Sequence, residues 1–399
     1  MTEKILIVED ENTNAMMLGR ILEREGYTIQ VATDGQEGVE LALAFPPDLI
    51  LLDISMPRKD GFQACTELKQ DEATRQVPII FLSGRSDTDD IVKGLEIGGN
   101  DYITKPFNKS EILARIKTQL KMYHLNRDLN DVNAVLQEKQ KRIDEDLQAA
   151  AVIQKSLLPM QHPEIDFGRL AWSFTPCEKV GGDIFNFFPL DDEHWALYML
   201  DVSGHGVPSA MISVSVSQLL NPQTGLLIKK STVAGPVPEL VAPTQLLAEL
   251  DRLYPFERFQ KYFTMSYVIC NCKTGELSYS SAGHPPPLIL RQNGEKEFLE
   301  KGGPIIGLGG VIPFEEGQAV LDHGDRLFLY TDGVYENRGG TDSFLGREGL
   351  YELFDQKKDL PLSEAIEEVF NTALDFGDRS NPDDDVSVLG FEFHKAGQA

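Results

Sequence analysis

The chain has 399 residues, enough for two or three domains that each bury a core. Its formal charge of −26, from 37 Lys and Arg against 63 Asp and Glu, argues against nucleic-acid binding, which needs a basic surface to neutralise phosphates. The four cysteines form no C-x-x-C pair, so we expect reduced thiols. The amino terminus MTEKILIVEDEN predicts a strand rather than a signal peptide, and apolar runs such as LILLDI are too short to cross a bilayer. We therefore expect a cytoplasmic protein that does not span a membrane.

Residues 1–121 alternate short apolar runs with amphipathic stretches, which predicts a first domain of alternating strands and helices. The expected strands are KILIVED, TIQVAT, LILLDI, PIIFLSG and DYITKP, and the expected helices are 12–25, 35–45, 61–72, 88–97 and 109–120. Strands that are almost continuously apolar, each followed by a helix, indicate a parallel five-stranded sheet covered on both faces. In such a sheet the functional crevice lies at the carboxyl ends of the strands.

Polar residues stand where these predicted strands end. Glu9 and Asp10 follow the first strand, Asp53 ends the third, Ser83 ends the fourth and Lys105 follows the fifth. Three carboxylates brought together repel one another unless a divalent cation lies between them, so we expect a Mg²⁺ site here. Lys105 and Ser83 would then contact an incoming phosphoryl group. The alternative, that these residues are unrelated strand-end caps, explains any one of them but explains all five poorly.

This segment resembles the receiver domain of two-component response regulators, the CheY-like domains with a flavodoxin-like α/β fold. The resemblance implies that Asp53 is the phospho-acceptor and that Glu9, Asp10 and Asp53 hold Mg²⁺. It also implies that Ser83 and Lys105 contact the phosphoryl group. The partner that supplies this group would be a sensor histidine kinase or a phosphotransfer protein.

Two further residues follow from the same resemblance. Tyr102 corresponds to the aromatic switch residue of the receiver family. Gly84 departs from the family, which usually has alanine directly after the hydroxyl residue, and the glycine is expected to loosen this turn without removing chemistry.

Residues 122–158 predict a helical connector, because neither glycine nor proline occurs before Pro159. Apolar residues recur every seven positions at Leu129, Leu136, Ile143, Ala150 and Leu157, and a companion row contains Leu125, Val132 and Ile153. This pattern favours a parallel two-stranded coiled coil, and hence a homodimer, weakened at its centre by Lys139 and Asp146. The alternative is one long helix that packs on its own domains.

Residues 159–399 predict an α+β domain in which strands outnumber helices. Expected strands include LAWSFTP, HWALYMLDVS, YFTMSYVICN, GELSYSSAG, PPLILR, GDRLFLYTDG and DVSVLGFEF, with helices over 209–220, 244–253 and 362–374. The pattern indicates a sandwich of two antiparallel sheets flanked by helices. The segment 221–245, with four prolines and two glycines, predicts a mobile flap or a plain surface loop.

Four aspartates stand at strand ends or tight turns of this domain: Asp183, Asp201, Asp332 and Asp384. Any one of them alone is best explained as a turn cap. Together, short carboxylate side chains beside glycines can bring several oxygens to one point, and oxygen ligands select Mg²⁺ or Mn²⁺. Two such ions about 4 Å apart would lower the pKa of a shared water and hold a phosphate ester for in-line attack.

The same segment resembles the type 2C protein phosphatases in their sporulation-protein-E, or RsbU-like, branch. The resemblance is carried, in the family's order, by VGGDIF, DVSGHGVPSA, SAGHPPPLIL, GGPIIGL, GDRLFLYTDGVYE and DDDVSVL. It implies that Asp201 bridges two metal ions, that Asp332 and Asp384 complete one site, and that Asp183 with the backbone carbonyl of Val202 completes the other. The ions would activate a water that attacks phosphoserine or phosphothreonine.

Three residues near these motifs have open interpretations. His205 is either a proton donor to the leaving alkoxide or part of a tight glycine turn. His284 is expected to be a packing residue. Asn186 stands where the family commonly has a further aspartate, which removes one negative charge near the site.

The sequence thus predicts a response regulator whose output is a metal-dependent serine/threonine phosphatase. The resemblance further implies a substrate, a phosphorylated STAS-type anti-sigma-factor antagonist of a partner-switching pathway. The alternative is a catalytically weak or inactive phosphatase-like domain that acts as a phosphorylation-gated, partner-binding adaptor.

Overall fold

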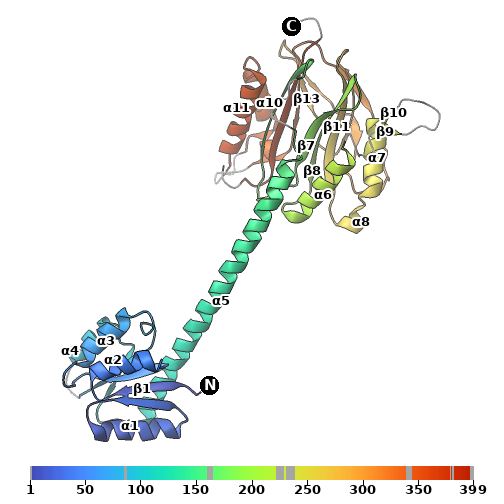
Figure 1. Cartoon of the computed structure of the whole chain (residues 1–399). Coiled ribbons are helices and arrows are strands. Elements are labelled where there is room, and N and C mark those ends of the chain that lie inside the picture. Colours follow the sequence, from blue (N-terminus) through green and yellow to red (C-terminus); the bar gives the residue numbers. More distant parts are fainter. Residues whose placement is uncertain are drawn as a thin grey trace. The chain divides into compact units, whose positions relative to one another are not determined.

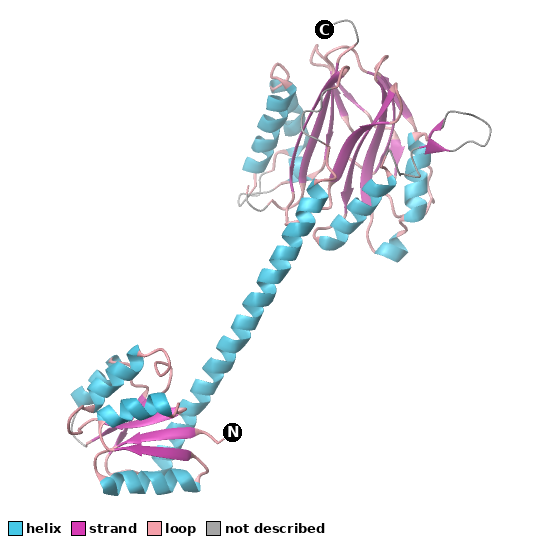
Figure 2. Cartoon of the chain, in the orientation of Figure 1, coloured by secondary structure: helices cyan, strands magenta, loops and turns pink. Residues whose placement is uncertain are grey.

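The structure is a computed structural model that describes residues 2–84, 88–159, 165–221, 229–230, 239–337, 344–377, 379 and 382–395. The chain divides into two compact units, Met1–Lys141 and Arg142–Ala399. Figure 1 colours the chain from the amino-terminal unit in blue to the carboxyl-terminal unit in red, and Figure 2 shows the helices and strands of each unit.

The amino-terminal unit contains the expected five-stranded parallel sheet, in the order β2-β1-β3-β4-β5. The strands are β1 (Lys4–Val8), β2 (Thr28–Ala32), β3 (Leu49–Asp53), β4 (Ile79–Ser83) and β5 (Asp101–Thr104). All residues of β3 and β4 are buried, as the apolar runs predict. The strand order reverses between β1 and β3, so a crevice is expected at the carboxyl ends of these two strands.

Helices cover both faces of this sheet. They are α1 (Asn12–Arg24), α2 (Gly35–Ala44), α3 (Gly61–Gln70), α4 (Thr88–Glu96) and α5 (Lys109–Lys155). Leu22 of α1 and Ile116 of α5 belong to the core on one face, whereas Val39 of α2 and Leu68 of α3 belong to the core on the other. These four helices therefore each pack an apolar face on the sheet.

Helix α5 is one continuous helix of 47 residues that joins the last helix expected for the first domain to the expected connector. Six apolar residues of the predicted heptad seam are more than half exposed in the single chain: Leu125, Leu129, Val132, Leu136, Ile143 and Ile153. These are the side chains that the heptad pattern assigns to contacts with a partner helix. The pairing of two such helices stays a prediction.

The carboxyl-terminal unit contains the expected pair of mainly antiparallel sheets. One has the order β15-β12-β11-β8-β7, with β16 also paired to β12, and the other has the order β14-β13-β17-β18-β6. The strands are β6 (Gly168–Thr175), β7 (Ile184–Pro189), β8 (His194–Val202), β11 (Phe263–Asn271), β12 (Glu276–Ala282), β13 (Leu288–Leu290), β14 (Lys296–Phe298), β15 (Gly302–Gly303), β16 (Gly317–Val320), β17 (Arg326–Tyr330) and β18 (Val386–Phe393).

Alternation along the strands builds two cores in this unit. In β17, Leu327 and Leu329 belong to the core shared by both sheets, whereas Phe328 and Tyr330 belong to a second core with the flanking helices. The helices are α6 (Val207–Leu219), α7 (Pro243–Leu253), α8 (Phe256–Phe259), α9 (Gly333–Glu336), α10 (Gly346–Gln356) and α11 (Leu362–Asp375). The three helices expected from the sequence correspond to α6, α7 and α11, and α8, α9 and α10 were not predicted.

Three other expectations concern loops, thiols and membranes. Of the expected flap 221–245, residues 222–228 and 231–238 lie outside the described residues; β9 (Lys229–Lys230) and β10 (Glu239–Leu240) form an antiparallel pair within it. All four cysteines are free, as expected. Within the described part of the chain, no helix has both the length and the hydrophobicity needed to span a bilayer.

Candidate functional site

The carboxyl ends of β1 and β3 bring three carboxylates together. One oxygen from each of Glu9, Asp10 and Asp53 lies within 4.8 Å of the other two. Glu9 and Asp53 are buried, whereas Asp10 is exposed, so the group opens to solvent on one side. The strand order explains the meeting, because β1 and β3 are parallel neighbours and their carboxyl ends reach the same edge.

Lys105 and Ser83 lie at the same edge of the sheet. Lys105 Nζ is 2.9 Å from Asp53 Oδ2 and donates a hydrogen bond of 2.9 Å to Glu9 Oε1. Burial raises the pKa of Glu9, the hydrogen bond from Lys105 partly offsets this rise, and the charge of Asp53 adds to it. Ser83 Oγ is buried and has no hydrogen-bond partner among the described residues. Crowded carboxylates beside a free hydroxyl and an ammonium group fit a hard cation and a phosphoryl group.

The two secondary residues of this site differ in their surroundings. The Tyr102 ring lies under the Arg115 guanidinium, whose central carbon is 5.3 Å from the ring centroid. Gly84 is exposed, and a Cβ built on it would meet no atom within 4 Å. An alanine would therefore fit at this position.

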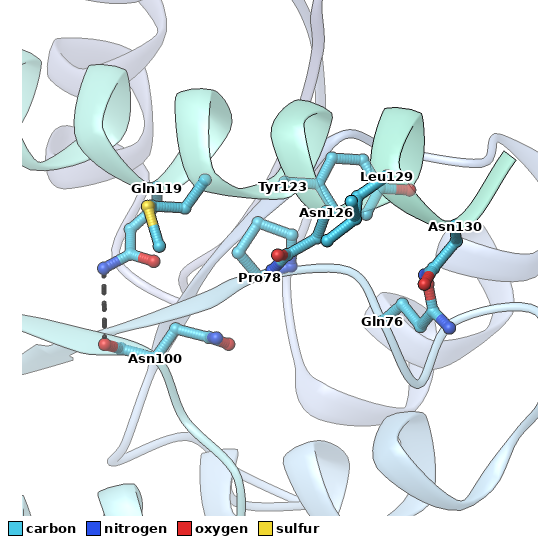
Figure 3. A pocket seen from close by; sticks show the side chains of 9 residues that line it. Gln76, Pro78, Asn100, Gln119, Tyr123, Asn126, Leu129 and Asn130 are labelled. Atoms are coloured by element: carbon cyan, nitrogen blue, oxygen red, sulfur yellow. Dashed lines mark hydrogen bonds between the residues drawn. The ribbon is translucent and has the colours of Figure 1, made fainter. Parts of the chain in front are cut away.

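A separate cavity of about 340 Å³ lies at the other end of β4 and β5. Its wall includes Pro78 and Asn100, which directly precede these strands, and Gln119 and Tyr123 of α5. Figure 3 shows Gln119 hydrogen-bonded to the backbone of Asn100, over a distance of 3.4 Å from Nε2 to O. None of the residues predicted for the phosphoryl site lines this cavity.

The four aspartates of the carboxyl-terminal unit lie at one end of the sandwich. Asp183 directly precedes β7 and Asp201 is the next-to-last residue of β8, and the pairing of Ile184 with Leu200 places them side by side. Asp332 follows β17 and Asp384 precedes β18, whose strands pair through Tyr330 and Val388. Asp183 is buried, Asp201 and Asp332 are partly exposed, and Asp384 is exposed, so the group runs from the core to the surface.

One carboxylate oxygen of Asp183 is hydrogen-bonded and the other is not. Its Oδ2 accepts hydrogen bonds from Thr331 Oγ1 at 2.9 Å and from Ser387 Oγ at 2.5 Å. Its Oδ1 is buried and has no hydrogen-bond partner among the described residues. A carboxylate oxygen without a partner costs free energy in the core, and a bound cation would remove that cost.

Burial raises the pKa values of all four aspartates, and the charges of neighbouring aspartates add to the rise at Asp183, Asp201 and Asp384. Burial raises the pKa of Asp201 from 3.8 to about 8, with contributions from the charges of Asp332 and Asp384. Burial and neighbouring aspartates raise the pKa of Asp384 to about 6 and hold that of Asp183 well above its ordinary value. Burial also raises the pKa of Asp332. Such a group binds either protons or cations.

Asp385 is an acidic residue of this site that the sequence reasoning missed. It accepts hydrogen bonds from the backbone amides of Cys177, at 2.8 Å from Oδ1, and of Asp183, at 3.0 Å from Oδ2. It therefore fixes the backbone that presents Asp183. Its adjacency to Asp384 before an apolar strand was the only signal in the sequence.

The four aspartates do not form a tight triad by themselves. In the described ranges, the tight three-residue groups of possible metal ligands are Glu9–Asp10–Asp53 and Cys177–Asp384–Asp385. The charges of Asp332 and Asp384 nevertheless raise the pKa of Asp201, and the charge of Asp201 raises that of Asp183, so the four carboxyls lie near one another.

The backbone carbonyl of Val202 faces the same loop. A Cβ built on Gly182 would lie 2.7 Å from the Val202 carbonyl oxygen, so only glycine leaves this oxygen uncovered. The carbonyl therefore lies next to the segment that carries Asp183. A carbonyl and several carboxylates are the donor set that Mg²⁺ and Mn²⁺ prefer.

The two histidines occupy different environments. His205 Nδ1 lies 2.6 Å from Glu178 Oε1, and both side chains are about half exposed. Its positive form would also stabilise the Asp384 carboxylate. His284 is buried, its Nδ1 lies 2.7 Å from Thr264 Oγ1, and burial lowers its pKa to about 3. His284 is thus neutral and belongs to the packing.

Family models match parts of both units of the chain. Residues 191–394 match the family model described as Stage II sporulation protein E (SpoIIE), and residues 5–117 match the Response regulator receiver domain. The chain is 41% identical over 136 residues to the response regulator ArlR of Staphylococcus saprophyticus, a match that covers 34% of this chain. It spans only 60% of the length of that relative.

Solved structures resemble the carboxyl-terminal unit. The SiaA-PP2C domain of Pseudomonas aeruginosa is 20% identical with a TM-score of 0.52, and the match covers 64% of this chain and 98% of that one. The RsbU and RsbW domains of a Mycobacterium tuberculosis protein are 23% identical with a TM-score of 0.47, covering 59% of this chain and 62% of that one. The first of these likenesses supports a type 2C phosphatase fold.

Proposed function

The chain belongs to the stage II sporulation protein E family and carries a response regulator receiver domain, and on this premise we propose that it is a response regulator with a phosphatase output. Its activity would be metal-dependent hydrolysis of phosphoserine and phosphothreonine in a protein. The observation that carries the proposal is the convergence of Asp183, Asp201, Asp332 and Asp384, whose raised pKa values mark a site that lacks positive charge.

The donor set fits two hard divalent cations, Mn²⁺ or Mg²⁺. In this proposal Asp201 would serve both ions, Asp332 and Asp384 would hold one of them, and Asp183 with the Val202 carbonyl would hold the other. Two observations support this assignment: Asp183 Oδ1 is buried and has no hydrogen-bond partner among the described residues, and the Val202 carbonyl oxygen lies close to Gly182. Bound ions of this kind supply an activated water and a binding site for a phosphate ester.

The residues around the ions have their own tasks. Asp384, at the exposed end of the group, marks the side from which a phosphoprotein enters. Glu178 holds His205 through Nδ1, which leaves Nε2 to carry the proton that the departing serine or threonine alkoxide needs. Thr331 and Ser387 keep Asp183 in place.

The receiver unit would control this output. Glu9, Asp10 and Asp53 would hold Mg²⁺, and Asp53 would accept a phosphoryl group from a sensor histidine kinase or a phosphotransfer protein. Lys105 Nζ, 2.9 Å from Asp53 Oδ2, and the partnerless Ser83 Oγ are placed to contact that group. The cation and hydroxyl would replace interactions that the transferred phosphate loses with water.

The proposed partners are proteins rather than nucleic acid or membranes, and the proposed location is the cytoplasm. The substrate would be a phosphorylated STAS-type anti-sigma-factor antagonist. A second copy of the chain would pair along α5, because the exposed seam residues, Leu129 and Leu136 among them, need an apolar partner.

Release of phosphate from p-nitrophenyl phosphate tests the activity. We expect manganese-dependent release by the full chain and its loss in Asp201→Ala. Turnover of a phosphorylated STAS-type protein, with and without acetyl phosphate, then tests the substrate and the control by Asp53.

A gated adaptor is the second candidate function. The wide spacing of the four aspartates, of which no three form a tight group in the described part of the chain, favours it. Binding of the phosphoprotein without phosphate release, in the presence of manganese, would support the adaptor and contradict the phosphatase.

A further inference from the structure

The carboxyl end of α5 is hydrogen-bonded to the loop that presents Asp183. Gln154, in the last turn of α5, is 4% exposed. Its Nε2 donates to the carbonyl oxygen of Gly181 at 2.7 Å, and its Oε1 accepts from the amide of Gly181 at 3.1 Å. One side-chain amide thus binds both polar backbone groups of one residue, two positions before Asp183.

A second attachment lies on the other side of Asp183. Asn186 Nδ2 donates to the carbonyl oxygen of Leu157, just after α5, at 3.0 Å. Asn186 Oδ1 accepts from the amide of Phe187 at 2.8 Å, which orients the side chain toward α5. The residue that departs from the family's aspartate is therefore engaged with the end of the connector.

Gly181, which Gln154 binds, is tightly packed against Asp385. A Cβ on Gly181 would lie 2.4 Å from Asp385 Oδ2, the oxygen that accepts the amide of Asp183. Gly181 itself is buried, so the loss of Gln154 would leave its amide and carbonyl without partners. A displacement of Gln154 is therefore passed to Gly181, then to Asp385 and Asp183.

We infer that Gln154 and Asn186 are positioning residues through which the end of α5 sets the place of the Asp183 carboxylate. Because α5 runs without a break from Lys109 to Lys155, a rotation or shift of this helix reaches the loop directly. The inference rests on the proposed function only in that it takes Asp183 as a metal ligand.

Three variants of the full chain test the inference. Gln154→Leu removes the two hydrogen bonds to Gly181 and a weaker one of 3.4 Å to Ser213 Oγ at nearly constant volume. Asn186→Leu removes the donor to Leu157 at nearly constant volume and adds no charge near the proposed metal site. Gln148→Leu, at an exposed position of the same helix, is the matched control. The measurements are manganese titration by calorimetry, amide hydrogen exchange over residues 181–183, and the unfolding temperature.

We expect both test variants to bind manganese at the phosphatase site about tenfold more weakly than wild type, as for the loss of other supports behind a metal ligand. Exchange at Gly181 and Asp183 should speed up, and Gln148→Leu should match wild type. Wild-type affinity and exchange in folded Gln154→Leu, or an equal loss in Gln148→Leu, would overturn the inference. If Gln154→Leu fails to fold, the same criteria apply to Asn186→Leu.

A second arm uses acetyl phosphate as the probe. Exchange at residues 181–183 should change on phosphorylation in wild type and stay constant in both test variants; a full response in Gln154→Leu and Asn186→Leu would overturn the inference. The two proposals fail separately. If wild type hydrolyses no phosphoester but the test variants change in manganese affinity and amide exchange, the proposed function fails and the positioning role stands. If wild type hydrolyses phosphoesters but the test variants keep wild-type affinity and exchange, the positioning role fails and the proposed function stands.

Discussion

Asp201, the proposed bridging ligand, shows how a buried carboxylate among like charges weakens the fold that carries it. Its pKa is raised from 3.8 to about 8 by burial and by the charges of Asp332 and Asp384. A group whose pKa is higher in the folded state stabilises the fold below its unfolded pKa, and this contribution is lost as pH rises through the folded pKa. Asp384, with a pKa raised to about 6, and Asp183 act in the same direction.

We therefore expect the metal-free carboxyl-terminal unit to lose stability between about pH 4 and pH 8, the window set by these shifts. Thermal unfolding of the full chain in a chelator, followed across this range, measures the effect. Manganese should remove most of this dependence of stability on pH, because bound cations replace the protons that the carboxyls lose. A metal-free transition that becomes more stable toward pH 8 would contradict the assignment.

Substitution of Asp201 by asparagine should separate stability from activity. At pH 8 and without metal, Asp201→Asn removes a buried charge among like charges, and we expect a gain of about 2 kcal/mol in the free energy of unfolding. Phosphate release should fall by at least about a thousandfold, because the proposed bridging ligand is lost. Urea unfolding compares the variant with Asp192→Asn, an exposed control. A destabilised metal-free variant would argue that Asp201 is merely structural.

Sequence reasoning reached the residues that end strands and missed those that act through long-range contacts. Asp183, Asp201, Asp332 and Asp384 stand out because each borders an apolar run or a glycine. Asp385 is set apart from its neighbour Asp384 by the hydrogen bonds that it accepts from the backbone amides of Cys177 and Asp183. These two residues lie more than 200 positions away in the chain. No local pattern encodes such a pairing.

Among the elements, α5 has a row of exposed apolar side chains that a second helix could cover. Its seam residues Leu129, Leu136 and Ile143 are 56%, 56% and 53% exposed. Burial of such side chains against a second helix stabilises each by about 1.5–3 kcal/mol. The charged positions Lys139 and Asp146 lower this gain at the centre of the helix.

We expect the full chain to be a dimer in light scattering at micromolar concentration, and Leu136→Glu to shift it toward monomers. Glutamate at a seam position would place like charges opposite each other in a parallel pair. Glu138→Gln, at an exposed position outside the seam, is the control. A wild-type chain that is monomeric at every concentration, with or without acetyl phosphate, would defeat the pairing.

The fold was largely readable from the sequence where periodicity was strong. The fully buried strands β3 and β4 appear as continuous apolar runs, and α11 shows a regular apolar stripe. Helices α8 and α9 are too short to show a helical repeat of apolar residues. In α10, Gly346 and Gly349 are poor helix formers, so the sequence does not indicate a helix there. Helix α10 is held by tertiary packing, such as the stack of Phe354 on Phe328 with ring centroids 4.1 Å apart.

At the scale of the whole molecule, the receiver and phosphatase domains imply control of one by the other. Phosphorylation of Asp53 should change the rate of phosphate release through α5. A shift from 1% to 99% active needs ~5.5 kcal/mol of differential stabilisation, more than one new phosphoryl contact supplies, so we expect a partial change. Comparing rates with and without acetyl phosphate, Asp53→Ala should show no response; a variant that still responds would refute this route.

The proposed phosphoprotein substrate is not encoded in the residues of the site. Carboxylates and a carbonyl at one end of the sandwich would suit any phosphoester. Recognition of a STAS-type protein would depend on surface complementarity, which neither a motif nor a strand pattern encodes.

Manganese titration by calorimetry tests the central claim most directly. The account predicts uptake of two ions by the carboxyl-terminal unit in the full chain, reduced in Asp201→Ala and unaffected by Asp53→Ala, which removes only the receiver ion. Manganese uptake that is the same in wild type and Asp201→Ala would contradict it.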